Sequence, residues 1–376
     1  MTLVDRYVLA IFLRTFVICF ISVSGMFIMG DFVGHIAEFV QSAGTESLVS
    51  VVWDFYAARL PWLFDILGKV VILVAAAFTI TWMQRNNELT ALMAAGISRW
   101  RVLRPVLLAA IVLSVLAGVS RELVLPHLRD SLGREARNLN GDALRTVSPL
   151  RDLFSDILIG GRHTISKDRR IVQPNFILPS NMSAYGTRIL TNYGLYMEAE
   201  AHHPAGYWLS EVLEPQQIDQ LPSYSINGKP VIMTRRDYPW LQPQTCFVAT
   251  ELPFELLDGG ADWRKMAGTP ELLRGLANPS LDFGAAELLT VHARVVQPLL
   301  DVTLLMLGLP LIMARGSRGI FVSIGSALLM VAAYYIGVAL SHTMGLNLFL
   351  SPMMAAWLPL FVFVPLAAWL ADPLFA

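Results

Sequence analysis

The chain has 376 residues, of which 55% are hydrophobic and only 15% are charged. An ordinary soluble domain carries about a quarter charged residues, so this composition argues against a soluble enzyme and for a membrane protein. The 28 Lys and Arg residues nearly balance 29 Asp and Glu residues, and a net charge of -1 excludes nucleic acid as the main partner. Two cysteines cannot form a disulfide framework or a CxxC metal site.

Six segments are apolar enough to cross a membrane, which takes about 20 residues for a hydrocarbon core of about 30 Å. Three lie in the first third of the chain and three at its end: Val8 to Gly30, Leu60 to Met83, Val102 to Leu125, Val295 to Met313, Ile320 to Leu340 and Met353 to Leu370. The first is longer than a signal-peptide core, and no Ala-x-Ala-like exit follows it. We therefore expect it to be retained as a span.

The distribution of Lys and Arg in the short loops predicts the orientation of these spans. If the N-terminus is cytoplasmic, the short loops on the outer side of the membrane contain only one basic residue, Arg59. The cytoplasmic side then contains eight: Arg6, Arg14, Arg85, Arg99, Arg101, Arg104, Arg315 and Arg318. Both termini are then inside. The polar stretch between the two triplets of spans lies outside the cytoplasm and is long enough for one compact domain.

Within that stretch, short runs of residues have the composition and spacing of strands. From Tyr193, the apolar residues Leu195 and Met197 alternate with polar ones, which is the two-residue period of a half-buried strand. Similar runs separated by turn-forming residues cover Ile171 to Leu178, Tyr207 to Leu213, Val231 to Arg235 and Thr245 to Leu252. They predict a small all-β sandwich or open barrel, followed by helices at Glu271 to Arg274 and Ala285 to Gln297.

The chain lacks the common motifs of nucleotide and metal chemistry. The pair Gly228 and Lys229 is followed by Pro230 and has no upstream glycine, so it is not a Walker A loop, and any ATP is hydrolysed by another chain. His202 and His203 are adjacent, which points them to opposite faces of a strand, and no HExxH sequence occurs. We expect no catalytic residue, no metal site and no cofactor in this chain.

The connector between the second and third spans, residues 84–105 (QRNNELTALMAAGISRWRVLRP), has the pattern of a short helix between two turns. Asn87 and Glu88 give this helix a polar start. Gly96 ends it, and Ser98 begins the next helix.

Leu89, Leu92 and Met93 form an apolar stripe on this helix, which is too short to span the membrane. We interpret the stripe as a docking face for a groove in a partner protein. The alternative is a tight hairpin whose arginines lie beside lipid phosphates.

The segment RNNELTALMAAGIS, followed by a proline at the head of the third span, resembles the signature of the LptF/LptG (YjgP/YjgQ) permease family. The N-terminal LVDRYVLAIFLRTF is also similar to that family. Further similar positions are Gln297-Pro298, LGLPL at Leu307 to Leu311, the turn at Arg315 to Gly319, Tyr334-Tyr335 and SPMMAAWLP at Ser351 to Pro359. The resemblance covers essentially the whole chain in order.

The resemblance implies an α-helical membrane protein with six transmembrane helices (3+3) and an inserted periplasmic all-β, jellyroll-like domain. Residues 1–125 would hold the first three helices and a cytoplasmic coupling helix at about 86–97, residues 126–284 the β-domain, and residues 285–376 the last three helices. The first and fifth spans would form lateral gates. The residues that would couple to the ATPase are Asn87, Glu88, Leu89, Leu92, Met93, Gly96 and Ser98.

The implied function is that of a permease subunit of an ABC transporter that extracts lipopolysaccharide from the bacterial inner membrane and passes it to a periplasmic bridge. An LptB-like ATPase dimer would bind ATP and Mg. The other implied partners are a second LptF/LptG-type permease, LptC-like and LptA-like periplasmic proteins, and membrane lipids. Either an LptF-like or an LptG-like role, in a homo- or hetero-pair, fits the sequence.

A lipid with several acyl chains needs an apolar route, because exposure of each methylene to water costs about 0.8 kcal/mol. We expect Leu195 and Met197 to line the interior of the β-domain and to contact the lipid. Lys69, roughly 12 Å inside its span, needs a partner, which is either Asp65 one turn away or a lipid phosphate. A membrane-embedded enzyme or a secondary transporter using Asp65, Lys69 or Asp301 is the alternative function.

Overall fold

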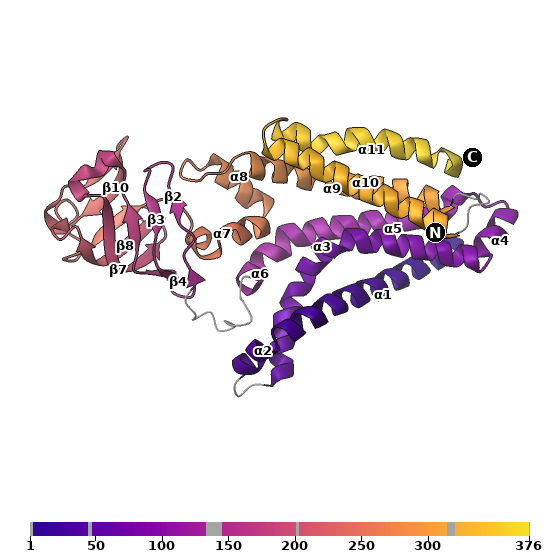
Figure 1. Ribbon diagram of the computed structural model, residues 1–376, viewed down its shortest axis with the longest axis horizontal. Helices are drawn as coiled ribbons and strands as arrows, with labels where there is room; N and C mark the ends of the chain where they lie inside the picture. Colours follow the sequence, from indigo (N-terminus) through magenta and orange to yellow (C-terminus); the bar gives the residue numbers. More distant parts are fainter. Residues whose placement is uncertain (1–2, 44–46, 133–144, 201–202, 314–319, 376) are drawn as a thin grey trace. The chain divides into compact units, whose positions relative to one another are not determined.

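The computed structural model describes residues 3–43, 47–132, 145–200, 203–313 and 320–375, and it divides into two compact units (Figure 1). The helical unit comprises residues 1–37, 46–128 and 284–376, and the β unit comprises residues 38–45 and 129–283. Arg315 and Arg318, which support the predicted orientation, and His202 lie outside the described residues.

The described part of the chain contains six helices long and apolar enough to cross a membrane, three on each side of the β region. They are α1 (Leu3–Gly34), α3 (Leu48–Arg85), α5 (Arg99–Val119), α9 (Ala285–Met313), α10 (Ile320–Leu346) and α11 (Pro352–Phe375). The predicted 3+3 arrangement is therefore confirmed. Helix α5 continues through a π-helical turn, Ser120–Val124, into α6 (Leu125–Leu132).

The helices extend beyond the apolar segments that predicted them. Helix α3 begins at Leu48 rather than Leu60, because the Ser47 side chain accepts a hydrogen bond from the Ser50 backbone N–H at 3.2 Å and caps the helix. The short helix α4 (Glu88–Ala94) occupies the predicted connector between α3 and α5.

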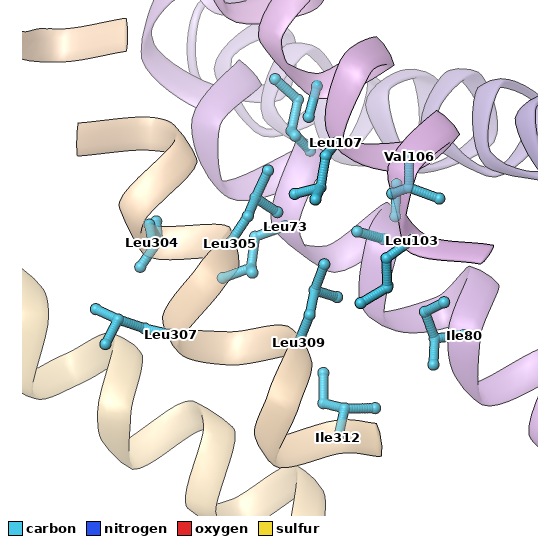
Figure 2. Packing of buried hydrophobic residues seen from close by; sticks show 14 of the residues in the cluster. Leu73, Ile80, Leu103, Val106, Leu107, Leu304, Leu305, Leu307, Leu309 and Ile312 are labelled. Atoms are coloured by element: carbon cyan, nitrogen blue, oxygen red, sulfur yellow. The ribbon is translucent and has the colours of Figure 1, made fainter. Parts of the chain in front are cut away.

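The core of the helical unit lies where α3, α5 and α9 meet. Figure 2 shows Leu73 of α3, Leu103 of α5 and Leu305 of α9 among the side chains that fill this space. A Cβ atom on Gly308 would lie 3.1 Å from the Leu73 side chain, so the absence of a side chain lets α9 approach α3 closely. Close packing of this kind drives the association of helices in lipid, where burial of apolar surface contributes little.

Between residues 145 and 249, the described part of the β unit forms an eleven-stranded antiparallel sheet. Its strands are β1 (Arg145–Thr146), β2 (Leu150–Arg151), β3 (Leu158–Gly160), β4 (His163–Ile165), β5 (Arg170–Val172), β6 (Asn175–Ile177), β7 (Arg188–Met197), β8 (Gly206–Glu214), β9 (Tyr224–Ile226), β10 (Lys229–Thr234) and β11 (Cys246–Ala249). The main path runs β1-β4-β5-β7-β8-β11-β10-β9, and β2, β3 and β6 branch from β7.

The branch point explains why the predicted strand Ile171 to Leu178 is two strands. Gln173 has a left-handed φ of 50°, and Pro174 has no backbone N–H to donate to a ladder. Strand β5 therefore pairs with the second half of β7, and β6 pairs with its first half.

The β unit buries one face of this sheet. Ile159, Phe176 and Ile189 are cross-strand neighbours on β3, β6 and β7, and all three are fully buried. Helix α7 (Phe254–Met266) adds Leu256 and Leu257 to the same core. Helix α7 was not predicted from the sequence, because Gly259 and Gly260 interrupt its helical pattern of apolar residues. Helix α8 (Thr269–Ala277) follows it.

Candidate functional site

The connector between α3 and α5 is held in a fixed shape by its turns. Asn87 adopts a left-handed conformation with a φ of 57°, which Asn tolerates better than most residues, and α4 starts directly after it. Gly96, with a φ of 79°, ends the helix. The Ser98 side chain then accepts a hydrogen bond from the Arg101 N–H at 3.4 Å and caps α5, as the sequence predicts.

The apolar stripe of α4 does not face outward. Leu89 is only 3% exposed, and Leu92 and Met93 pack against the same core of the helical unit. Our inference that the stripe needs a groove in a partner was therefore wrong, because the stripe is buried within its own chain. The outward face of α4 instead carries the exposed residues Thr90 and Ala91.

A side-chain hydrogen bond of Glu88 joins the connector to helix α1. The Tyr7 hydroxyl of α1 donates a hydrogen bond to Glu88 Oε2 at 3.0 Å. Sequence reasoning missed Tyr7, because no local pattern links two residues this far apart in the chain. Movement of α4 can therefore be transmitted to α1 through one polar contact.

Asp65 does not pair with Lys69. The Arg121 guanidinium, in the π-helical turn after α5, donates from Nε to Asp65 Oδ1 at 2.8 Å and from a second nitrogen to the same oxygen. The intrahelical Asp65–Lys69 pair that the spacing favoured is therefore wrong. An arginine offers two donors in a fixed fork, which makes it a better carboxylate partner than a lysine one turn away.

Further polar contacts continue this cluster along α9. Arg294 donates a hydrogen bond to Glu122 at 3.4 Å, and the Gln297 amide donates to Asp301 Oδ1 at 2.6 Å. The Ser114 hydroxyl of α5 donates to the other oxygen of Asp301. Arg294 and Asp301 are seven residues apart, roughly 10 Å along the helix, so a polar column runs between α3, α5 and α9.

Lys69 lies beside this column without joining it. It is half-buried and close enough to Asp301 and Asp65 to interact with them electrostatically. Its ammonium makes no hydrogen bond or ion pair to any residue that the structure describes. The charge of Lys69 is therefore offset only by the longer-range attraction of Asp301 and Asp65 and not by a hydrogen bond to either carboxylate.

A second feature of the helical unit is a hollow of about 390 Å³ between α1 and α3, lined mainly by apolar residues such as Phe32 and Trp53. Tyr56 also lines the hollow, and its hydroxyl donates a hydrogen bond to Asp31 at 2.7 Å. The Arg59 guanidinium lies 3.4 Å from the centre of the Phe55 ring, and Phe55 precedes Arg59 by one turn of α3.

The β7 residues that we expected to face the interior lie on the opposite face of the sheet. Leu195 is 42% exposed, and Met197 packs against a separate cluster that contains Met233 and Phe247, outside the main β core. Tyr196, between them, is the residue that packs against that core. The expectation that Leu195 and Met197 line the interior was wrong, because β7 carries apolar residues on both faces and alternation alone cannot say which face is inside.

Two groups in the β unit have pKa values shifted by their surroundings. Burial raises the pKa of the Cys246 thiol to about 12, so this cysteine stays protonated at neutral pH. The Ser223 backbone N–H donates to Asp237 at 2.5 Å and lowers the pKa of that carboxyl below its ordinary value of 3.8. Among the described residues, no group of three His, Cys, Asp or Glu side chains is arranged to hold a metal ion.

Comparison with known proteins identifies one family. The sequence profile described as "Lipopolysaccharide export system permease LptF/LptG" matches residues 6–159 and 218–372. The gap between the two matched parts spans β4 to β8. No curated protein matches the chain.

Proposed function

The chain belongs to the lipopolysaccharide export system permease LptF/LptG family, and we propose that it is the permease subunit of an ABC transporter that extracts lipopolysaccharide from the inner membrane. A separate LptB-like ATPase dimer binds ATP and Mg and supplies the energy. The family makes the chain a transporter component. The partnership with an ATPase and the route of the lipid are our proposals for this chain.

The observation that carries this proposal is the construction of α4. Its apolar side is anchored on the core through Leu89, so a force applied to its exposed side at Thr90 and Ala91 acts on the helical unit as a whole. Glu88 adds a contact to α1 through Tyr7. A helix held in this way transmits the motion of a docked ATPase to the spans better than one that swings freely.

The orientation follows from the arginine distribution. The connector with Arg85, Arg99 and Arg101 lies in the cytoplasm, where the ATPase is. Both termini are then cytoplasmic, and the β unit is periplasmic. There it hands the lipid to LptC-like and LptA-like proteins of the bridge.

A second permease of the same family completes the transporter. In the described residues, α1 packs on α3 and α5, whereas α10 packs on α9 and α11. Both helices keep exposed apolar residues, such as Ile21 on α1 and Leu329 on α10. These surfaces suit contact with lipid and with a second permease, and they support the assignment of the two helices as gates.

We assign Lys69 to a phosphate of the lipid headgroup. The competing explanation was a pair with Asp65, and Asp65 is occupied by Arg121. The Lys69 ammonium, which makes no hydrogen bond to a described residue, fits a doubly phosphorylated lipid, for which lysine acts as a point charge. The same contacts argue against an enzyme or a secondary transporter, since Asp65 and Asp301 are bound by Arg121 and Ser114 rather than presented to a substrate.

The direct test is the set of proteins that co-purify with the full chain in mild detergent, identified by mass spectrometry. We expect an ATPase with a Walker A loop and a permease of this family. Ala91→Arg on the exposed face of α4 should lose the ATPase. Ala184→Arg, at a position in the β unit that is also exposed, should keep it. Recovery of the chain without any ATPase, or an ATPase unaffected by Ala91→Arg, would contradict the proposal.

A further inference from the structure

The hairpin between β9 and β10 turns at Asn227 and Gly228. Ile226 of β9 pairs with Lys229 of β10, which leaves these two residues in the loop. Asn227 has a φ of 51° and Gly228 a φ of 79°. Positive φ values at both loop residues are typical of a type I′ turn, for which Asn-Gly is a preferred sequence. The tight turn therefore accounts for this dipeptide.

The same two residues are open to water. Asn227, Gly228 and Lys229 are all exposed, and no atom lies within 4 Å of the position that a Cβ atom on Gly228 would occupy. Neither the Asn227 side chain nor the Gly228 backbone N–H makes a hydrogen bond to any residue that the structure describes. The Asn227 carboxamide and the Gly228 nitrogen are therefore not held by other groups of the described chain.

An asparagine carboxamide next to such a nitrogen undergoes an intramolecular reaction. The Gly228 backbone nitrogen attacks Cγ of Asn227, so that a new C–N bond forms and the bond from Cγ to the side-chain nitrogen breaks. Ammonia leaves with the proton that the Gly228 nitrogen loses, and a cyclic succinimide remains. The reacting groups lie on adjacent residues, so no second molecule has to be bound and oriented.

Water then opens the succinimide and is the only co-reactant. Addition of water to the carbonyl carbon derived from the side chain breaks its bond to the ring nitrogen and gives aspartate. Addition to the backbone carbonyl carbon gives isoaspartate, in which the chain continues through the former side chain. Both products carry a new carboxylate at position 227, and isoaspartate also lengthens the backbone by one carbon atom.

The glycine after the asparagine distinguishes this position from the others. Among the asparagines that the structure describes, only Asn227 precedes a glycine, whose missing Cβ leaves the attacking nitrogen unhindered. Asn278 precedes Pro279, which has no N–H to lose. The pair Asn140-Gly141 lies outside the described residues, so a measurement has to resolve the two Asn-Gly positions.

The turn supports a strand at the edge of the sheet. Strand β9 is the last on the main path and, among the described strands, pairs with β10 alone. Its Tyr224 and Ile226 side chains pack against the core of the β unit. An extra backbone carbon at position 227 does not fit a two-residue type I′ turn, which sets the register of the hairpin. Isoaspartate therefore breaks the pair of Ile226 and Lys229.

We propose that Asn227 is a site of spontaneous deamidation, converted through the succinimide into isoaspartate and aspartate, and that this conversion loosens β9 from the sheet edge. Ring closure requires the Asn227 backbone to rotate out of the turn, and exposed loop tips open locally without unfolding of the domain. The folded chain therefore reacts more slowly than a short peptide of the same sequence. This inference lies beyond the transport function and needs neither lipid nor an ATPase.

The test is incubation of the purified full chain in detergent, in neutral and in mildly alkaline buffer, followed by proteolysis and mass spectrometry. We expect the peptide that contains Asn227 to gain the mass difference between a carboxyl and an amide group, and to yield two products of equal mass. The gain should be faster in alkaline buffer, because loss of its proton activates the attacking nitrogen. A sample digested without incubation corrects for conversion during proteolysis. An Asn227 peptide that stays unmodified in the chain, while a synthetic peptide of the same sequence is converted, would overturn the proposal.

Two variants assign the mass gain to this residue. Asn227→Gly keeps a sequence that suits the type I′ turn and removes the carboxamide, so its turn peptide should show no gain. Asn181→Gly, which changes another exposed asparagine of the β unit, should leave the conversion at Asn227 unchanged. The same gain in the turn peptide of Asn227→Gly would refute the assignment.

Hydrogen exchange measures the effect on the strand. After conversion, the backbone amides of β9 should exchange about fivefold faster, as expected for the loss of one backbone hydrogen bond. The β9 amides of Asn227→Gly, incubated in the same way, should keep their original rate. Equal exchange of β9 in the fresh and the converted chain would refute the loosening of this strand. Neither measurement uses lipid release, so failure of this proposal is distinguishable from failure of the transport proposal.

Discussion

Arg121 and Asp65 form the tightest ion pair of the polar column, and their side chains are only 15% and 16% exposed. Removing one partner of a buried pair leaves the other charge without compensation, which costs about 3–5 kcal/mol. Lys69 has no such partner among the described residues. The two neighbouring charges of α3 should therefore respond oppositely to substitution.

We expect Asp65→Ala to lower the thermal stability and abundance of the full chain, whereas Lys69→Met lowers neither of them and reduces the lipopolysaccharide that co-purifies. Asp65→Leu combined with Arg121→Met should restore stability, since replacing a whole buried pair by apolar residues is close to neutral. Lys69→Arg, which keeps the charge, is the control. Unchanged lipid content in a stable Lys69→Met protein would remove the substrate role of Lys69.

Glu88 combines an internal hydrogen bond with an expected contact to the ATPase, and two variants separate these roles. Glu88→Ala removes both and should lower ATP-driven lipid release at least tenfold. Tyr7→Phe removes only one hydrogen bond, worth about 1 kcal/mol, and should lower release about fivefold or less. If Tyr7→Phe reproduces the full defect of Glu88→Ala, Glu88 acts only by positioning α1.

At the level of elements, the helices were predictable and their buried faces were not. Six long apolar segments define six spans, and Gly96 and Ser98 mark the turn around α4. The stripe of Leu89 on α4 has the same periodicity whether it packs on its own chain or on a partner. Strand β7 has apolar residues on both faces, so the tertiary fold decides that Tyr196 rather than Leu195 faces the core.

The residues of the polar column were only partly visible in the sequence. Asp65, Lys69 and Asp301 stand out as charges within apolar segments. Their partners, Arg121 and Ser114, are 56 and 187 residues away in the chain and follow no local spacing rule. The branching of the sheet at β7 was not predicted, because it depends on the left-handed conformation of Gln173 and on Pro174 rather than on the alternation of apolar residues.

The segment between β10 and β11 provides a test of pH dependence. The pKa of Asp237 in the folded chain lies below its value in the unfolded chain. The ionised carboxylate therefore contributes its full stabilisation of the folded state above pH 3.8, and this contribution is lost as the pH falls through the lowered pKa. We expect the Ser223 amide to be protected from hydrogen exchange at neutral pH and to lose protection only in stronger acid, after correction for the intrinsic exchange rate.

Asp237→Asn should reduce the protection of the Ser223 amide at neutral pH and remove its pH dependence. Asp168→Asn, a change of another exposed aspartate on a different turn, serves as the control. Neutral-pH protection in Asp237→Asn equal to that of the unmodified chain would show that the carboxylate does not hold this segment.

At the scale of the whole molecule, the orientation in the membrane can be tested by cysteine labelling of intact cells. Asn227→Cys in the β unit should react with an impermeant maleimide, whereas Arg99→Cys in the connector should react only after the cells are opened. Cys246 does not interfere, because it is buried and its pKa is raised to about 12. Rapid labelling of Arg99→Cys in intact cells, with none at Asn227→Cys, would reverse the proposed topology.

The transport function itself is tested most directly with the chain and its co-purifying partners reconstituted in liposomes that contain lipopolysaccharide. Release of the lipid to a soluble periplasmic acceptor is then measured with and without ATP. We expect release that requires ATP and is lost in Glu88→Ala, while the complex still assembles in the bilayer. Release at the same rate without ATP, or ATP hydrolysis by the assembled complex without any release, would contradict it.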